Sequence, residues 1–409
     1  MSHKETYYRK KIINQLYFSE ALSSTELSTM NGKSIPLITE LINQLIKEGF
    51  IEESGYAPST GGRKPLLYSI TSGIFYIIAV AIDQVSIRIA ILDSHNKFVS
   101  KVRKIDLTPN GNKEILPLLA KQIQEIIKVS GISKEKILGV GIGMPGLIDI
   151  KNGVNSAYLN PETGSSIIKS VKEALGKNIP VFIENDSKLV ALSELKWGNA
   201  KGQQNGLVIN IGYSLGLGII IGGKIFKGHE GFAGEFGHIP LFVNRKLCSC
   251  GKTGCLETEA SLLVVANKAM EGIQNGKLSI LSNAEPNTKE KLVKEVLDAA
   301  IRGDKHTIEI ISEAGYHIGK GISVLIHLFN PHLIVLSGLG TTVGRIYLAP
   351  IQQAINEHGI PMLSKSVKIE MSSLGYDAAL LGAAGLVMEN FEHLTLLDKK
   401  QTRKSSKTS

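Results

Sequence analysis

The chain has 409 residues, of which 43% are hydrophobic and 20% charged, the composition of an ordinary water-soluble globular protein. A chain of this length is too long to fold around one typical hydrophobic core, so we expect two or three domains. No apolar run reaches the length needed to cross a bilayer, and the first residues lack the apolar segment of a signal peptide. We therefore expect a cytoplasmic protein without a membrane partner.

The net charge of +9 permits a polyanionic partner, but the excess of cations is unevenly placed along the chain. Residues 1–70 are nearly neutral, with eight Lys or Arg against seven Asp or Glu. Residues 396–409 form a basic tail with five cations and one anion and no apolar pattern, so we expect it to be disordered. The overall charge alone therefore does not indicate DNA binding.

Residues 1–72 have the pattern of a winged helix-turn-helix. An apolar stripe predicts a first helix over residues 5–19, and Ser23 to Glu26 have the hydroxyl-then-acid pattern that starts a second. The second helix should stop at Asn31-Gly32, and Ser34 should cap a third, whose apolar residues share one face. Two short strands, at 50–53 and 66–70, flank a Gly-Gly-Arg-Lys-Pro wing.

The third helix would place its first exposed side chains in the major groove of DNA, and the slim cationic wing suits a narrow minor groove. The candidate DNA contacts are Lys33, Ser34, Leu37, Thr39, Arg63 and Lys64. The alternative is a small helical interaction domain with a solvated loop, which the near-neutral charge of the segment favours.

From Tyr76 onward the chain has an α/β pattern. Strands are predicted at 77–82, 86–92, 97–105, 138–143 and 181–183, with a helix over 114–129. A second set follows, with strands at 206–211, 218–221 and 334–336, a long helix over 305–329 and a small-residue helix over 378–388. Two such units in series predict two related lobes with a cleft between them: 73–185, completed by a C-terminal helix at about 377–395, and 186–376.

All three cysteines of the chain lie within eight residues, at Cys248, Cys250 and Cys255, and His238 lies ten residues before the first. Three thiolates and one imidazole complete a tetrahedral zinc shell with no open position for water, so the predicted Zn²⁺ is structural. The alternative is a set of buried or loosely paired cysteines, although an odd count in so small a window disfavours a disulfide framework.

The stretch from Gly231 to His238, followed by Cys-x-Cys-Gly-x-x-Gly-Cys-Leu-Glu, resembles the signature of the ROK family of bacterial repressors, open reading frames and sugar kinases. The resemblance implies a two-lobed actin/hexokinase-like (ribonuclease H-like) body. In the repressor branch of the family, a winged helix-turn-helix precedes that body, as it does here. The resemblance covers nearly the whole chain except the tail.

The resemblance also implies a set of functional residues. His238, Cys248, Cys250 and Cys255 match the zinc ligands of the family, and Asp186 matches the base of its kinases. The positions that match sugar contacts are Gly146, Asn160, Asn185, Asp186, Glu235, His238 and Glu257. Carboxylates, amides and close backbone suit a ligand rich in hydroxyls, whereas the alternative for Glu235 and Glu257 is ordinary surface charge.

Three stretches depart from the nucleotide motifs of the family's kinases. Residues 83–87 read Asp-Gln-Val-Ser-Ile instead of Asp-x-Gly-Gly-Thr, and residues 212–218 lack the Thr and second Gly of Gly-Thr-Gly-x-Gly-x-Gly. The adenosine loop keeps Gly338 and Gly340 but has Leu339 between them. We therefore expect no catalysis and a vestigial role for Asp186, although Ser86 could partly replace a phosphate-contacting Thr.

The sequence thus favours a sugar-responsive transcriptional regulator, most simply a repressor, which binds operator DNA and a sugar or sugar phosphate as a dimer or tetramer. One alternative is an active ATP-dependent sugar kinase that carries a DNA-binding arm. The other is an interaction protein whose winged domain contacts protein.

Overall fold

The computed structural model describes residues 3–58, 64–106, 115–155, 166–176, 179–243, 246–284 and 286–393. Arg63, Asn160 and the basic tail at 396–409 lie outside the described residues. Among the helices of the described ranges, each is too short or too polar to cross a membrane.

The N-terminal part contains the predicted three helices and a three-stranded antiparallel sheet of order β1-β3-β2. Its elements are α1 His3–Ser19, β1 Leu22–Ser23, α2 Ser24–Asn31, α3 Ile35–Lys47, β2 Ile51–Tyr56 and β3 Leu66–Ile70. Ser23 and Glu26 form a capping box that starts α2, and Gly32, with φ of 57°, ends it. The short strand β1, which the sequence did not predict, extends the wing sheet by pairing with β3.

The first lobe is built on a five-stranded sheet of order β10-β7-β4-β5-β6. Its elements are β4 Tyr76–Ile82, β5 Ser86–Asp93, β6 Arg103–Asp106, α4 Ile115–Ser130, β7 Ile137–Met144, β8 Ile148–Asp149, β9 Val154–Asn155, α5 Ile167–Leu175 and β10 Val181–Asn185. The predicted strand over 97–105 is wrong in its first half, because the hydroxyl of Ser100 accepts the Ile91 amide, at 3.0 Å, in place of a backbone carbonyl.

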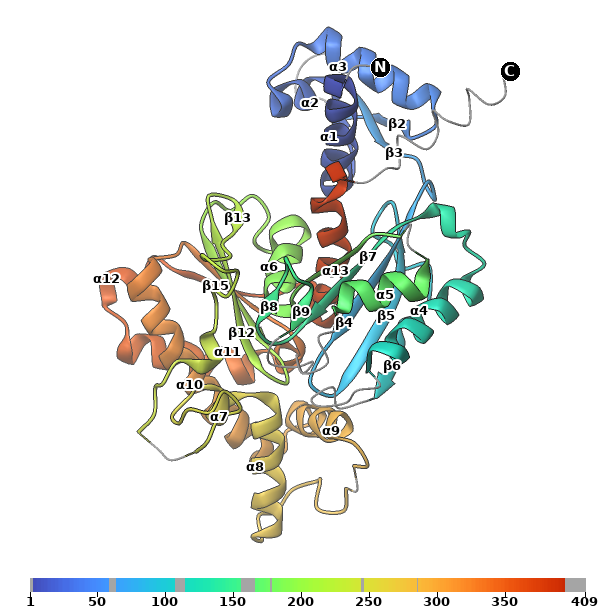
Figure 1. Cartoon of the computed structure of the whole chain (residues 1–409). Helices are drawn as coiled ribbons and strands as arrows, with labels where there is room; N and C mark the ends of the chain where they lie inside the picture. The colour runs from blue at the N-terminus through green and yellow to red at the C-terminus, as the bar shows by residue number, and fades with distance from the viewer. Residues whose placement is uncertain are drawn as a thin grey trace.

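The second lobe repeats this topology in a sheet of order β13-β12-β11-β14-β15 (Figure 1). Its elements are α6 Asp186–Trp197, β11 Gly206–Ile211, β12 Leu215–Ile221, β13 Lys224–Ile225, α7 Glu257–Ala260, α8 Leu262–Gln274, α9 Lys289–Ile301, α10 Lys305–Phe329, β14 Leu333–Ser337, α11 Arg345–His358, α12 Pro361–Ser364, β15 Lys368–Met371 and α13 Ala378–Glu389. In each sheet an antiparallel meander is extended by two parallel strands. The two-lobed α/β fold predicted from the sequence is therefore confirmed.

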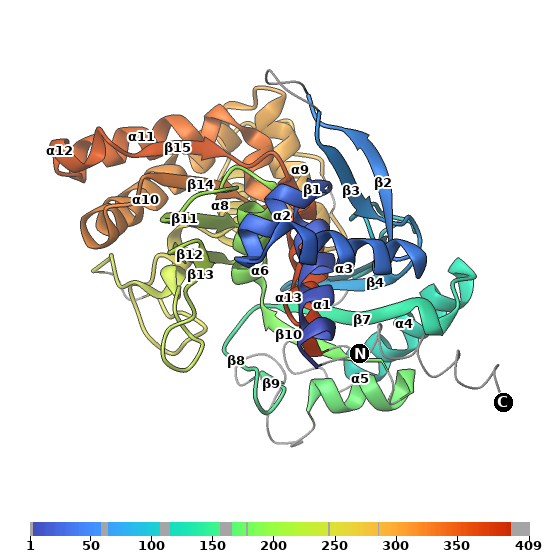
Figure 2. The same cartoon turned by 90° about the horizontal axis from the view of Figure 1, so that it is seen from above.

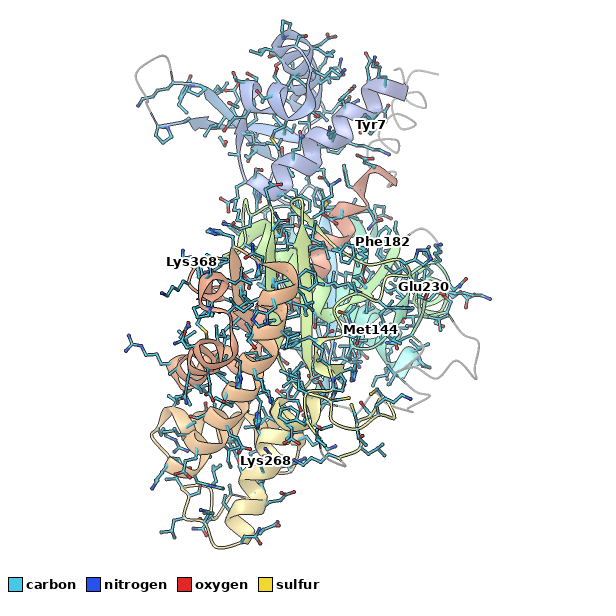
Figure 3. The ribbon with its side chains drawn as sticks, turned by 90° about the vertical axis from the view of Figure 1, so that its left-hand side faces the viewer. Tyr7, Met144, Phe182, Glu230, Lys268 and Lys368 are labelled. Atoms are coloured by element: carbon cyan, nitrogen blue, oxygen red, sulfur yellow. The ribbon has the colours of Figure 1, made fainter. Side chains whose placement is uncertain are left out.

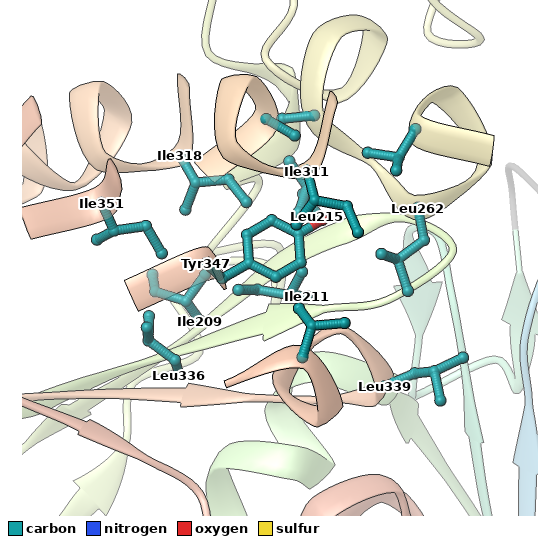
Figure 4. Packing of buried hydrophobic residues seen from close by; sticks show 14 of the residues in the cluster. Ile209, Ile211, Leu215, Leu262, Ile311, Ile318, Leu336, Leu339, Tyr347 and Ile351 are labelled. Carbon is teal, nitrogen blue, oxygen red and sulfur yellow. The ribbon is translucent and has the colours of Figure 1, made fainter. Parts of the chain in front are cut away.

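The core of the second lobe lies between its sheet and the helices α10 and α11. Figure 4 shows the ring of Tyr347, which is fully buried, among aliphatic side chains from the strands and from both helices. These neighbours include Ile209, Ile211, Ile311, Ile318 and Ile351. A rigid core of this kind allows the loops at the strand ends to hold a site in a defined geometry.

Helices α6 and α13 lie side by side between the lobes. Helix α13 packs on the sheet of the first lobe, and α6 packs on the sheet of the second lobe. The contacts are so close that they require glycine. A Cβ on Gly141 of β7 would lie 1.9 Å from the carbonyl oxygen of Ala383, and one on Gly218 of β12 would lie 2.1 Å from the Cβ of Ala191. We propose residues 185 and 186, where β10 ends and α6 begins, as the boundary between the lobes.

The winged part stands at one end of the molecule, with α1 directly over the C-terminal end of α13 (Figures 1 and 2). Figure 3 shows the same arrangement from the side, with Tyr7 in the winged part and Lys268 at the opposite end of the body. Asn14 donates to the Met388 carbonyl, and the Lys10 ammonium donates to the Glu392 carbonyl at 3.1 Å.

Aromatic side chains complete the contact between α1 and the body, which we call the seat of α1. The ring of Trp197, at the end of α6, lies 6.0 Å from that of Tyr17 and 5.5 Å from that of Phe18, centroid to centroid. The ammonium of Lys196 lies 4.3 Å from the Phe18 ring centroid. Both interlobe helices thus end against the first helix of the winged part.

Candidate functional site

The four predicted zinc ligands come together on the loop that follows β13. One ligand atom from each of His238, Cys248, Cys250 and Cys255 lies within 4.8 Å of every other. The Cys248 Sγ lies 3.4 Å from Nδ1 of His238, and the sulfur atoms of Cys250 and Cys255 are 3.7 Å apart. A tetrahedral zinc with Zn–S bonds of about 2.3 Å would separate two sulfur ligands by about 3.8 Å, so the donor set fits Zn²⁺.

The fold of the loop explains how residues at this spacing converge. Gly254 has φ of 79°, and a Cβ there would lie 2.2 Å from the Phe242 carbonyl oxygen, so the turn requires glycine. Bridges between Pro240 and Cys255 and between Leu247 and Thr253 close the loop on itself. With Nδ1 of His238 facing the sulfurs, its Nε2 points toward Glu235, at 3.9 Å from Oε2. One ring can therefore serve the metal and the neighbouring site together.

Three predicted sugar contacts form the floor of a site between the lobes. Asn185 ends β10, and its Oδ1 accepts from the amides of Ser187 and Lys188, at 3.1 and 3.2 Å, which caps α6. Its Nδ2 donates to the carbonyl of Gly146 at 3.3 Å. Asn185 therefore has a structural role as a helix cap, which was not predicted from the sequence, and this role places Asp186 at the first residue of α6.

Four carboxylates, which we call the interlobe carboxylates, surround this floor: Asp83, Asp186, Glu235 and Glu257. Burial, together with the negative charges of Asp83 and Glu235, raises the pKa of Asp186 to about 6. Burial also raises the pKa of Glu257 to about 7, although the Leu215 amide donates to it at 2.8 Å. The pKa of Glu235, which is the most exposed of the four, is raised by partial burial.

The three stretches predicted to depart from nucleotide motifs also meet between the lobes. They line a cavity of about 40 Å³, room for only a few water molecules. Asp83, Tyr213 and Gly338 come from the three stretches, and Arg88 and Tyr376 are among the other residues that line the cavity.

Arg88 and Tyr376 were not identified from the sequence. The Tyr376 hydroxyl donates to Asp83 at 2.9 Å, and the Arg88 guanidinium lies 3.4 Å from the centroid of the Tyr376 ring. Arg88 also donates to the Tyr376 carbonyl at 3.0 Å. The two residues come from β5 and from the turn before α13, almost 300 residues apart in the chain, so their meeting depends on the tertiary fold.

Two lysines beside the site were also missed. Lys188, on α6, is only 3% exposed and donates to the carbonyl of Gly231 in the loop that carries Glu235. Lys227 crosses between the lobes to the buried carboxylate of Glu184 at 2.7 Å. The Asn-Asp-Ser-Lys run places Lys188 two residues after Asp186, which matches the base of the family's kinases, and this is the one signal that could have identified it.

Four of the predicted DNA contacts, Lys33, Ser34, Leu37 and Thr39, lie around the start of α3. Ser34 is its exposed N-terminal cap, and Thr39 lies on a shallow outer face of α3 that ends at Lys47. Lys64, after the wing turn, is exposed. Two of these side chains are not freely exposed. The Lys33 ammonium lies 5.3 Å from the Tyr8 ring centroid, and Leu37 is partly buried against the apolar core.

Comparisons with known proteins show that this chain is similar to members of one protein family. The ROK family model matches residues 77–390. The xylose repressor of Caldicellulosiruptor bescii is 28% identical over 384 residues, covering 93% of this chain and 94% of that protein. The glucokinase of Halalkalibacterium halodurans is 30% identical over 315 residues, covering 77% of this chain and 95% of that enzyme.

Among solved structures, that of a ROK family transcriptional regulator, a homologue of the Escherichia coli MLC protein, matches with a TM-score of 0.75 and 25% identity. It covers 97% of this chain and 99% of that one.

Proposed function

Because this chain belongs to the ROK family, we propose that it is a sugar-responsive transcriptional regulator, most simply a repressor. Its winged helix-turn-helix binds operator DNA, its interlobe site binds a sugar or a derivative of one, and its zinc is structural. The repressor relative aligns along the whole chain, whereas the glucokinase relative lacks the N-terminal region. This difference in coverage supports, at the level of the family, a regulator over a sugar kinase.

The observation that carries the proposal is the seat of α1 on the ends of both interlobe helices. Helix α6 begins with Asp186 in the interlobe site and ends with Trp197 against α1. Its 12 residues span about 18 Å as one rigid rod. A change in lobe closure that tilts α6 or α13 would therefore move the winged part as well.

The size of the response is set by binding thermodynamics. The sugar shifts the protein between two closures only by its difference in affinity for them, and it changes the DNA affinity by the same coupling free energy. Zinc contributes by holding the loop of Glu235 and His238 in place. Two copies of the chain would match two half-sites about one helical turn apart, so we propose a dimer or a tetramer as the DNA-bound form.

The departures from the family's nucleotide motifs support a protein without kinase activity. Tyr213 stands where the second phosphate loop of the family has Thr, and it lines the cavity between the lobes together with Tyr376 and Arg88. Phosphoryl transfer needs a cradle for the phosphates, and residues 83–87 and 212–218 depart from the motifs that supply it in the family's kinases. Asp186 then accepts a sugar hydroxyl without acting as a base.

Fluorescence anisotropy with DNA from upstream of the protein's own gene tests the proposal. We expect sequence-specific binding that D-xylose, D-glucose or N-acetylglucosamine changes at least fivefold. ADP formation is measured in parallel with ATP, Mg²⁺ and the same sugars. Turnover at kinase rates would favour the sugar kinase, and an absence of specific DNA binding with and without sugar would favour the interaction protein.

A further inference from the structure

The outward face of α3 is one row of exposed side chains. Pro36, Glu40, Asn43 and Lys47 follow one another at intervals of four, three and four residues, the spacing of a single helix face. The opposite, apolar face of the helix is buried in the winged part. Helix α3 lies on the side of the winged part away from the body (Figure 1), so this row is the surface that a DNA groove would meet.

Glu40 is the member of this row that opposes DNA by its charge. Phosphates line both edges of every groove, and they repel a carboxylate brought close to them. The side chain of Glu40 is exposed, and within the part of the chain that the structure describes no Lys, Arg or His pairs with it. The cation of α3, Lys47, lies two turns further along the helix. Since the protein does not neutralise this charge, a group on the DNA has to offset it.

The base edges of the major groove supply few groups that can do so. Guanine and thymine present acceptors there, whereas cytosine presents its N4 amino group, to which carboxylates accept. Adenine presents a donor beside an acceptor, a pair that suits the amide of Asn or Gln and leaves a carboxylate facing the N7 lone pair. Glu40 therefore fits a C·G pair, and Asn43 fits an A·T pair.

We propose that Glu40 is a specificity-determining residue that selects a C·G pair in each half of the operator, beside an A·T pair read by Asn43. This inference rests on the proposed DNA-binding function and names the base chemistry that the function uses. At about 1.5 Å per residue the two side chains start about 4.5 Å apart along α3, close to the spacing of about 3.4 Å between base pairs. A site without the C·G pair leaves the carboxylate against acceptors and phosphates, so Glu40 also weakens binding to other DNA.

Selection from duplexes with randomised half-sites, using the full-length protein with and without the sugars named above, tests this inference. The wild type should enrich a motif in which a C·G pair adjoins an A·T pair. Because Gln pairs with adenine, Glu40→Gln should change the C·G preference to A·T at that position alone, and Glu40→Ala should lose the preference without gaining another. A wild-type motif without the C·G pair, or the same motif in all three proteins, would overturn the inference and leave the regulator intact. If the wild type enriches no motif, the proposed regulator itself fails.

Fluorescence anisotropy separates a base contact from a general effect of charge. Glu40→Gln should weaken binding to the wild-type motif about tenfold or more and strengthen binding to an unrelated duplex, because it removes both the contact and the repulsion. Glu52→Gln, an exposed change on β2 with the same change in charge, is the matched control and should alter both affinities by the same factor. If Glu40→Gln also alters both affinities by one factor, Glu40 is a surface charge without a role in specificity.

Discussion

Replacement of Asp186 by Asn should stabilise the folded protein and weaken its sugar binding. Burial and the charges of Asp83 and Glu235 raise the pKa of this carboxyl from its usual value to about 6. At 1.36 kcal/mol for each pKa unit, a shift of this size corresponds to about 3 kcal/mol of destabilisation when the group is ionised. Because Asp186 is partly accessible to solvent, we expect a gain of about 1–3 kcal/mol in the free energy of unfolding at pH 8.

The pH dependence gives the sharper test. A carboxyl whose pKa is raised on folding is ionised in both states at pH 8, where its cost is complete, and protonated in both below about pH 3, where the cost disappears. The stabilisation by Asp186→Asn should therefore be largest at pH 8, fall steeply between pH 6 and pH 4, and approach zero near pH 3. The side-chain oxygen of Asn can still accept the Ser187 amide, which Asp186 binds at 2.8 Å, so that contact is retained.

Differential scanning calorimetry at pH 8 and pH 4, with the exposed change Asp298→Asn as control, measures the effect. The control should alter stability by no more than about 0.5 kcal/mol at either pH. Sugar affinity should fall roughly tenfold to a hundredfold in Asp186→Asn, the usual effect of losing a hydrogen bond to a charged group. A variant that is no more stable than the wild type at pH 8, or that gains equally at both pH values, would refute the reasoning.

Three further predictions concern the metal, the seat of α1 and the wing. Cys250→Ser should lower zinc content well below one per chain by plasma mass spectrometry and lower the Tm, whereas full retention of zinc would contradict the tetrahedral site. Phe18→Ala removes a ring contact with Trp197 and a cation contact with Lys196, worth about 1–2 kcal/mol together. It should reduce the effect of sugar on DNA affinity several-fold with unchanged sugar affinity by calorimetry, and an unchanged effect would exclude this route. Lys64→Ala should weaken DNA binding and reduce the slope of its salt dependence by about 1, with sugar affinity intact; loss of both would make the wing structural.

Local sequence patterns predicted the winged part well. The capping box of Ser23 and Glu26, the stop at Gly32 and the apolar face of α3 are each encoded within a few residues, and the helices occur where these signals lie. The candidate zinc cluster was equally easy to recognise, because four residues of the right type lie within a stretch of 18 residues. Signals of this kind depend on chemistry that is local along the chain.

Helix α6 shows why other elements escaped. Nine of its twelve residues are buried, among them Lys188 and Glu194, because it lies between α13 and the second sheet. A helix covered on nearly all sides has no apolar stripe opposite a polar one, so its period cannot be recognised from the sequence. The capping role of Asn185 was hidden for the same reason.

The sequence by itself determined the order of the parts, the α/β class, the four residues that cluster as a candidate metal site and the chemical types of the proposed sugar contacts, since neighbouring residues or a motif of fixed spacing encode each of them. Only the tertiary structure decided which groups occupy the space between the lobes. The carboxylate of Asp83 meets the hydroxyl of Tyr376 across 293 positions of the chain, and Trp197 meets Tyr17 across 180. Such contacts depend on how two sheets and their shared helices pack, which no local pattern of residues specifies.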